Sequence, residues 1–106
     1  NEMALIAVKP NGETAEQIGV ARYTTNLDLR SCEFALVVSD AWQGHGIGHQ
    51  LMRKLMEVAR DRGLERMQGQ VLSNNSRMLN LMRSLNFTIA PDPDDIAVKV
   101  VDIGLN

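Results

Sequence analysis

The chain has 106 residues, which is enough for one small domain with a single core and too few for two. Its 11 Lys and Arg against 13 Asp and Glu give a formal net charge of −2, without the basic excess typical of nucleic-acid binders. Apolar residues make up 44% of the chain, yet no apolar run approaches the roughly 18 residues of a membrane span. We therefore expect one globular domain with neither nucleic acid nor membrane among its partners.

Cys32 is the only cysteine, so the chain cannot form an internal disulfide, and we expect a reducing, cytoplasmic location. A lone cysteine in a strand is typical of a small core residue. No signal peptide is recognisable. Because the sequence opens directly on strand-like residues without an initiator Met, we expect residues 1–106 to be a single domain excised from a longer chain.

Two strands joined by a hairpin are predicted at the start of the chain. Residues 3–10, which end at Pro10, have the β-former content and length of a strand, and residues 17–25 form the second arm. The NGE segment at residues 11–13 is a turn signal between them.

A third strand is predicted at residues 32–39, after a polar turn at residues 26–31. Its alternate side chains form two faces, made of Phe34, Leu36 and Val38 on one side and Glu33, Ala35 and Val37 on the other. Because both faces are largely apolar, we expect a central strand that is covered on two sides.

A glycine-rich loop leads directly into the clearest helix of the sequence. Gly44, Gly46 and Gly48 lie within five positions of one another. Apolar residues then recur with the period of a helix, at Ile47, Leu51, Leu55, Val58 and Ala59. Gly63 is a typical helix stop.

The second half of the chain predicts one more helix and three more strands. In order, these are a strand at residues 66–73, a capping turn at 74–76, a helix carrying Met78 to Leu85, and strands at 87–90 and 96–105. The strand–helix–strand unit from Cys32 to Ser73 predicts one parallel pair. The element order therefore predicts an α/β (α+β) fold with a mixed, mostly antiparallel sheet.

The glycine loop has the properties of an anion site. The first N–H groups of a helix lack partners and lie at the positive end of its dipole. Glycine removes the side chains that would keep an anion away from them. A flexible turn without a ligand is the alternative. The Gly-Lys-Ser/Thr of a Walker loop is absent, and the glycine spacing does not fit a dinucleotide fingerprint.

The spacing does fit Q-x-x-G-x-G, formed by Gln43, Gly46 and Gly48. The strand CEFALVVS precedes it, and NNSRMLNLMRSLNF follows, with Asn75, Leu81 and Phe87 in place. In this order the segments resemble the GCN5-related N-acetyltransferases (GNAT) over residues 3–106. They are most similar to the C-terminal acetyltransferase domain of bacterial Pat-type protein lysine acetyltransferases. The resemblance implies a GNAT fold whose N-terminal strand and helices are absent from this sequence.

The same resemblance implies acetyl-CoA as co-substrate and no metal. The loop would hold the pyrophosphate and the preceding strand the pantetheine arm. The implied cofactor-binding residues are Leu36, Val37, Val38, Gln43, Gly44, His45, Gly46, Ile47, Gly48 and Asn75. A helix cap is an alternative role for Asn75. A metal pair of His45 and His49 has no further ligands in evidence.

Glu33 is the candidate general base. Acetyl transfer needs a neutral amine, whereas a free lysine amine has a pKa of about 10.4. Glu33 precedes the loop between apolar residues, where partial burial would raise its pKa, and protein-acetylating GNATs often carry a glutamate on this strand. A solvated strand charge is the alternative. The family's acid tyrosine is replaced by Met82, and the Gly of G-F by Asn86, so the source of a proton for the thiolate stays open.

The implied reaction is acetyl transfer from acetyl-CoA to a primary amine. A protein lysine side chain is the expected acceptor, with an acyl-CoA synthetase as a candidate partner. A small-molecule amine acetyltransferase and a non-catalytic acyl-CoA-binding regulatory module are the alternatives. The final strand, residues 96–105, offers a sheet edge through which a homo-oligomer would pair.

Overall fold

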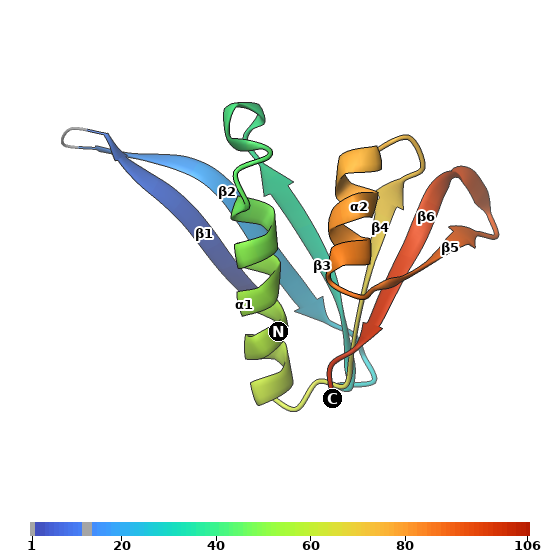
Figure 1. The fold of residues 1–106 in the computed structure, drawn as a ribbon. Coiled ribbons are helices and arrows are strands. Elements are labelled where there is room, and N and C mark those ends of the chain that lie inside the picture. Colours follow the sequence, from blue (N-terminus) through green and yellow to red (C-terminus); the bar gives the residue numbers. More distant parts are fainter. Residues whose placement is uncertain (1, 12–13) are drawn as a thin grey trace.

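The computed structural model describes residues 2–11 and 14–106. Their backbone forms one mixed six-stranded sheet and two α-helices (Figure 1). The elements are β1 (Glu2–Asn11), β2 (Thr14–Thr25), β3 (Ser31–Val38), α1 (Ile47–Asp61), β4 (Arg66–Leu72), α2 (Ser76–Ser84), β5 (Thr88–Asp92) and β6 (Asp95–Gly104). The strand order is β1-β2-β3-β4-β6-β5, and only β3 and β4 run parallel. The predicted fold class is confirmed.

The first two strands pair antiparallel, with Met3 opposite Tyr23 and Ala7 opposite Gly19. Both strands of the predicted hairpin are therefore present. The turn predicted at residues 11–13 includes residues 12–13, which lie outside the described residues.

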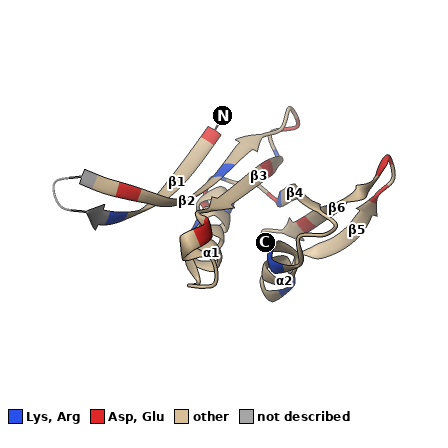
Figure 2. Ribbon diagram, turned by 90° about the horizontal axis from the view of Figure 1, so that it is seen from above, with Lys and Arg blue, Asp and Glu red and all other residues tan. Residues whose placement is uncertain are grey.

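Both helices pack on the same face of the sheet (Figures 1 and 2). The core lies between this face and the helices. Its fully buried side chains include Ala21, Cys32, Met52, Leu55, Met67, Met82 and Val101. On the opposite face of β3, Glu33 and Val37 are both exposed, and the exposed fraction of Val37 is 68%. The prediction that β3 is covered on both faces is therefore wrong for the described chain, because α1 and α2 share one side.

The amphipathic pattern of α1 explains how it is held. Leu51, Met52, Leu55 and Ala59 are buried against the sheet. Burying a side chain such as Leu55 contributes about 1.5–3 kcal/mol. The helix ends where predicted, because Gly63 follows it with a φ of +87°, in the left-handed region that glycine adopts without strain. No helix in the described ranges combines the length and apolarity that crossing a bilayer requires.

The last strand, β6, is an interior strand. It pairs antiparallel with β4 on one side and with β5 on the other. The prediction that residues 96–105 offer a sheet edge to a second copy is therefore wrong. In the strand order of the described residues the edges are β1 and β5, since the turn after Asp92 returns β6 into the space beside β4.

The parallel pair of β3 and β4 is short. Only Ser31, Cys32 and Glu33 pair with β4, and the two strands diverge beyond that point (Figure 1). The ring of Phe34 lies over Gly69 on β4, where a Cβ atom would come 2.7 Å from its Cζ atom. The bulk of Phe34 therefore occupies the space in which the two strands would otherwise continue to approach.

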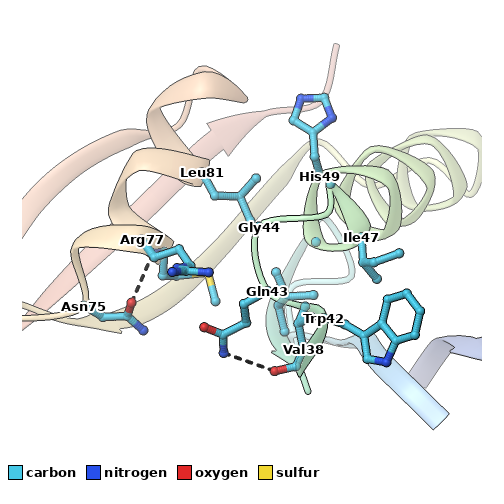
Figure 3. Close-up of a pocket in the computed structure, with 13 residues that line it drawn as sticks. Val38, Trp42, Gln43, Gly44, Ile47, His49, Asn75, Arg77 and Leu81 are labelled. Atoms are coloured by element: carbon cyan, nitrogen blue, oxygen red, sulfur yellow. Dashed lines mark hydrogen bonds between the residues drawn. The ribbon is translucent and has the colours of Figure 1, made fainter. Parts of the chain in front are cut away.

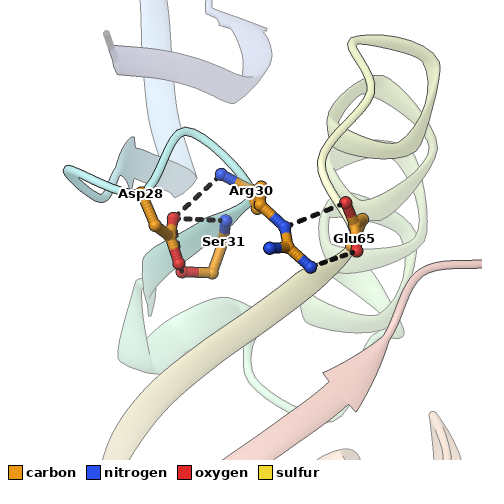
Figure 4. Close-up of polar contacts among 4 residues, drawn as sticks. All are labelled: Asp28, Arg30, Ser31 and Glu65. Atoms are coloured by element: carbon orange, nitrogen blue, oxygen red, sulfur yellow. Dashed lines mark hydrogen bonds and ion pairs between the residues drawn. The ribbon is translucent and has the colours of Figure 1, made fainter.

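Polar contacts fasten the opposite end of this pair, as Figure 4 shows. The carboxylate of Asp28 accepts hydrogen bonds from the backbone N–H groups of Arg30 at 2.8 Å and Ser31 at 2.9 Å. These bonds lower the pKa of Asp28 from its ordinary value. The Arg30 side chain pairs with Glu65, whose own N–H donates to the Arg30 carbonyl at 2.7 Å. The turn before β3 is thereby joined to the loop before β4.

Candidate active site

The loop between β3 and α1 has the conformation of an anion cradle. Gly44 and Gly46 have φ values of +85° and +79°, which side chains rarely adopt. Gly46 is the N-cap of α1, so no side chain caps this helix start, and its first turn carries no acidic residue. A Cβ atom on Gly46 would meet no atom within 4 Å. Open space therefore lies beside N–H groups at the positive end of a helix.

Gln43 fixes this loop to the end of β3. Its Nε2 atom donates to the Val38 carbonyl at 3.2 Å (Figure 3). The same atom donates to the Asp40 carboxylate, also at 3.2 Å. A glutamine is suited to this position because it reaches back over several residues and can donate two hydrogen bonds at once. The first residue of the Q-x-x-G-x-G pattern thus has a structural role in the loop.

A pocket of about 240 Å³ lies between this loop and α2 (Figure 3). Eight of the ten predicted cofactor-binding residues line it, namely Leu36, Val38, Gln43, Gly44, Gly46, Ile47, Gly48 and Asn75. The other two predicted residues, Val37 and His45, are not among the lining residues. The structure thus brings segments from β3, the loop, α1 and α2 around one pocket.

The sequence interpretation did not assign five further lining residues, which are Trp42, His49, Arg77, Met78 and Leu81. Arg77 extends from α2 toward the loop (Figure 3), and its Nη1 atom lies 3.5 Å from the position of a Cβ on Gly44. Met78 and Leu81 are three apart on α2, a spacing that predicted only core packing. Arg77 had no such signal, because a cation on an amphipathic helix ordinarily faces solvent.

Asn75 caps α2 as predicted. Its Oδ1 atom accepts a hydrogen bond of 3.1 Å from the N–H of Met78. This bond uses the acceptor side of the amide, so the Nδ2 side is left as a donor at the pocket. Asn75 can therefore cap the helix and bind a ligand acceptor at the same time.

The backbone of β3 offers hydrogen-bonding groups to the gap beside β4. The Ser39 N–H donates to the Ile18 carbonyl at 2.8 Å, which sets the phase of the antiparallel ladder with β2. Backbone N–H and C=O groups alternate in direction along a strand. Those of Val37 therefore point toward β2, and those of Leu36 and Val38 point toward the gap. The Val38 carbonyl is bonded to Gln43, so the Leu36 groups and the Val38 N–H are the ones that face a ligand.

A second cavity, of about 400 Å³, occupies the gap where β3 and β4 diverge. Glu33, Phe34, Gln68 and Gly69 are among its lining residues. Leu36 and Met78 line both this cavity and the loop pocket, so the two adjoin. Glu33 lines the second cavity but not the loop pocket, and it is exposed, so the predicted partial burial is not seen.

Neither the loop pocket nor the cavity between β3 and β4 is lined by a tyrosine. Tyr23 is 2% exposed in the core, and Met82, at the position of the family's acid, is fully buried. Within residues 2–11 and 14–106, no group of three His, Cys, Asp or Glu side chains is placed to hold a metal. Burial raises the pKa of the Cys32 thiol to about 11, which disfavours the thiolate that a nucleophile requires.

Known proteins share this arrangement. Residues 1–87 match the family model described as acetyltransferase (GNAT) family. Acetyltransferase PA5475 of Pseudomonas aeruginosa is 33% identical over 93 residues, which cover 88% of this chain and 50% of that protein. The L-methionine sulfoximine/L-methionine sulfone acetyltransferase of Salmonella typhimurium is 33% identical over 67 residues, 63% of this chain and 39% of that protein.

The crystal structure of the GNAT domain of S. lividans PAT has the same fold. It superposes with a TM-score of 0.83 at 25% sequence identity, and the match covers 97% of this chain and 60% of that one. The chain spans about half the length of the first curated relative that it matches. The glycine loop, the diverging strands and the family match agree with one another, and the chain belongs to the acetyltransferase (GNAT) family.

Proposed function

We propose that the chain binds acetyl-CoA and transfers its acetyl group to a primary amine. The observation that carries the proposal is the junction of the two cavities at Leu36 and Met78. One cavity begins at a loop built for a phosphate, and the other holds Glu33. A ligand with a phosphate at one end and a reactive group at the other fits this path.

In this proposal, acetyl-CoA contacts the loop, β3 and α2. The pyrophosphate accepts hydrogen bonds from the loop between Gly44 and Gly48, and Arg77 adds a positive charge beside it. The pantetheine amides pair with the Leu36 groups and the Val38 N–H in the manner of an added strand. Asn75 donates from its Nδ2 atom to the same arm. The thioester then lies in the gap between β3 and β4.

The chemistry that follows is a direct transfer. The neutral amine attacks the thioester carbonyl carbon, the C–S bond breaks, and the products are an amide and CoA. Glu33, directly or through a water molecule, takes the proton that the amine loses. The thiolate leaves with a pKa of about 8.5, so it departs without a tyrosine acid. A backbone N–H of β3 in the gap stabilises the charge on the carbonyl oxygen.

A protein lysine is the acceptor that we propose. Glu33 lies on the face of the sheet that α1 and α2 leave open, where a side chain from another protein has access. The likeness to the GNAT domain of S. lividans PAT favours this acceptor, and an acyl-CoA synthetase stays the candidate partner. The likeness to the L-methionine sulfoximine/L-methionine sulfone acetyltransferase favours a small amino-acid acceptor as the second candidate.

Titration calorimetry with acetyl-CoA tests the loop. Gly46→Glu places bulk and negative charge at the phosphate position and should weaken binding on the order of a hundredfold, or about 2.7 kcal/mol. Gly63→Glu is the matched control, because Gly63 also has a positive φ and no atom within 4 Å of its Cβ position, at the other end of α1. Equal affinity of the two variants, or no binding by the parent chain, would contradict the proposal.

Turnover tests Glu33 and the acceptor. Glu33→Gln should lower kcat on a lysine peptide on the order of a hundredfold, with little change in acetyl-CoA affinity. The same assay with L-methionine sulfone in place of the peptide separates the two acceptor classes. Binding of acetyl-CoA without transfer to either acceptor would contradict the proposed catalysis and favour a non-catalytic acyl-CoA-binding module.

A further inference from the structure

Phe34 occupies the position at which β3 and β4 separate. It is the first β3 residue after Glu33, the last one paired with β4. It lines the cavity in the gap together with Leu36, Val71 and Met78. The ring therefore forms the end of the gap that lies farthest from the glycine loop.

The position of Phe34 matches the reach of the bound ligand. A strand advances about 3.3 Å per residue, so Phe34 lies about 13 Å along β3 from Val38, where the loop begins. An arm that runs along β3 from a phosphate at the loop thus brings its thioester end toward this ring. Phe34, Leu36, Val71 and Met78 give this cavity an apolar part, which suits a hydrocarbon acyl group, beside the polar side chains of Glu33, Gln68 and Gln70.

Two neighbours restrict the ring of Phe34. On the β4 side it lies over Gly69, where a Cβ atom would come 2.7 Å from Cζ and 2.9 Å from Cδ1. The ring also packs on that of Phe87, with the two ring centroids 5.5 Å apart and the rings inclined by 56°. Close packing of this kind resists displacement of the ring.

We propose that Phe34 limits the length of the acyl chain that the site accepts. The inference rests on the proposed function, because it places the acyl group of an acyl-CoA in the gap. An acetyl group fits in front of the ring, whereas each further methylene of a straight chain must displace the ring or bend away from it. Phe34 is thus a specificity-determining residue, and Gly69 and Phe87 hold it in position.

Calorimetric titrations of one thioester series test this role without knowledge of the acceptor. The series is CoA, acetyl-CoA, butyryl-CoA and hexanoyl-CoA, titrated into the parent chain, Phe34→Leu and Phe34→Met, with the fold of each variant checked by circular dichroism. The parent should bind acetyl-CoA more tightly than hexanoyl-CoA. Either variant should shift this ratio toward hexanoyl-CoA on the order of tenfold, with CoA affinity unchanged. Because the ratio is taken within one variant, a smaller folded fraction does not alter it.

The outcomes separate the inference from the function on which it rests. A ratio in either folded variant equal to that of the parent overturns the role of Phe34 while the binding of acetyl-CoA stands. A parent that binds hexanoyl-CoA as tightly as acetyl-CoA overturns it as well. A parent that binds no member of the series overturns both the inference and the proposed function.

Discussion

The two ends of the β3–β4 pair contrast sharply. At one end, Ser31 to Glu33 pair with β4, and the flanking loops are joined by hydrogen bonds through Asp28, Arg30 and Glu65. At the other end, from Phe34 onward, the same strands separate and a cavity of about 400 Å³ lies between them. At the closed end the backbone N–H and C=O groups form hydrogen bonds within the sheet and its loops. At the open end these groups are left free to bond to a ligand.

This difference shows how one pair of strands serves two purposes. If β3 and β4 stayed paired along their whole length, the sheet would have more backbone hydrogen bonds but no space for a thioester. A sheet that parted throughout would lose the strand pairing that joins β1-β2-β3 to β4-β6-β5 in the described residues. Substitutions at each end should therefore have different consequences, stability at the closed end and binding at the open end.

The largest effect on stability is expected at Gly69, where the closed end of the β3–β4 pair meets the open end. Gly69→Ala puts a Cβ atom into the Phe34 ring and should lower the free energy of unfolding by about 2 kcal/mol. Urea denaturation measures it. Gly104→Ala is the matched control, since Gly104 also lies in a strand of the sheet but has no atom within 4 Å of its Cβ position. Similar losses in both variants would show that Phe34 does not press on Gly69.

Asn75 separates structure from binding at the open end. Asn75→Ala removes the cap of α2 and should cost about 1 kcal/mol of stability. Asn75→Asp keeps an acceptor for the Met78 N–H and should retain that stability, yet it removes the donor at the pocket and adds a negative charge. Thermal unfolding and acetyl-CoA titration of the pair should thus diverge. An Asp variant that binds acetyl-CoA like the parent would rule out the donor role.

The turn at the closed end holds a strained residue, so one substitution there should stabilise the chain. Leu29 has a φ of +59° and is 71% exposed, a conformation that costs leucine energy and gains it no burial. Leu29→Asn should raise the free energy of unfolding by about 0.5 kcal/mol, because asparagine tolerates the left-handed region. The midpoint of urea denaturation reports it. A midpoint lower than that of the parent would contradict the strain argument.

The smallest expected effect appears only in acid. Hydrogen bonds from the Arg30 and Ser31 N–H groups lower the pKa of Asp28 below its ordinary value of 3.8. A lowered folded-state pKa adds stability above pH 3.8 that is lost as the pH falls through the folded value. The stability difference between the parent and Asp28→Asn should therefore shrink between neutral pH and pH 3. A constant difference across that range would show that the charge of Asp28 plays no part.

Local patterns predicted much of the molecule. The helical period from Ile47 to Ala59 located α1, Gly63 located its end, and Asn75 located the start of α2, because each of these signals acts over a few residues. The loop glycines were predictable for the same reason, since positive φ values and helix starts leave a mark in sequence. Eight of the ten cofactor-binding residues that the family resemblance implied do line the loop pocket.

Features that depend on distant residues were not predictable. The point at which β3 and β4 part has the ring of Phe34 over Gly69, 35 positions away in sequence. The interior place of β6 depends on which side of β5 the chain returns, and no local pattern sets it. Arg77 joins the pocket only because α2 packs beside the loop. The exposure of Glu33 likewise depends on both helices sharing one face of the sheet.

The gap between β3 and β4 has a further consequence, which concerns the extended ligands that can pair with its backbone groups. The Leu36 backbone groups form an unpaired edge in the interior of the sheet rather than at its margin, flanked by Phe34, Val71 and Met78. Exposed edges ordinarily invite any extended chain to pair with them. This edge lies between two strands, with side chains such as Phe34, Val71 and Met78 beside it, so a slender arm that bears amides but no side chains meets less obstruction there than an extended polypeptide. The fold thus places the unpaired Leu36 groups away from the margin of the sheet, where an extended chain would have easier access to them.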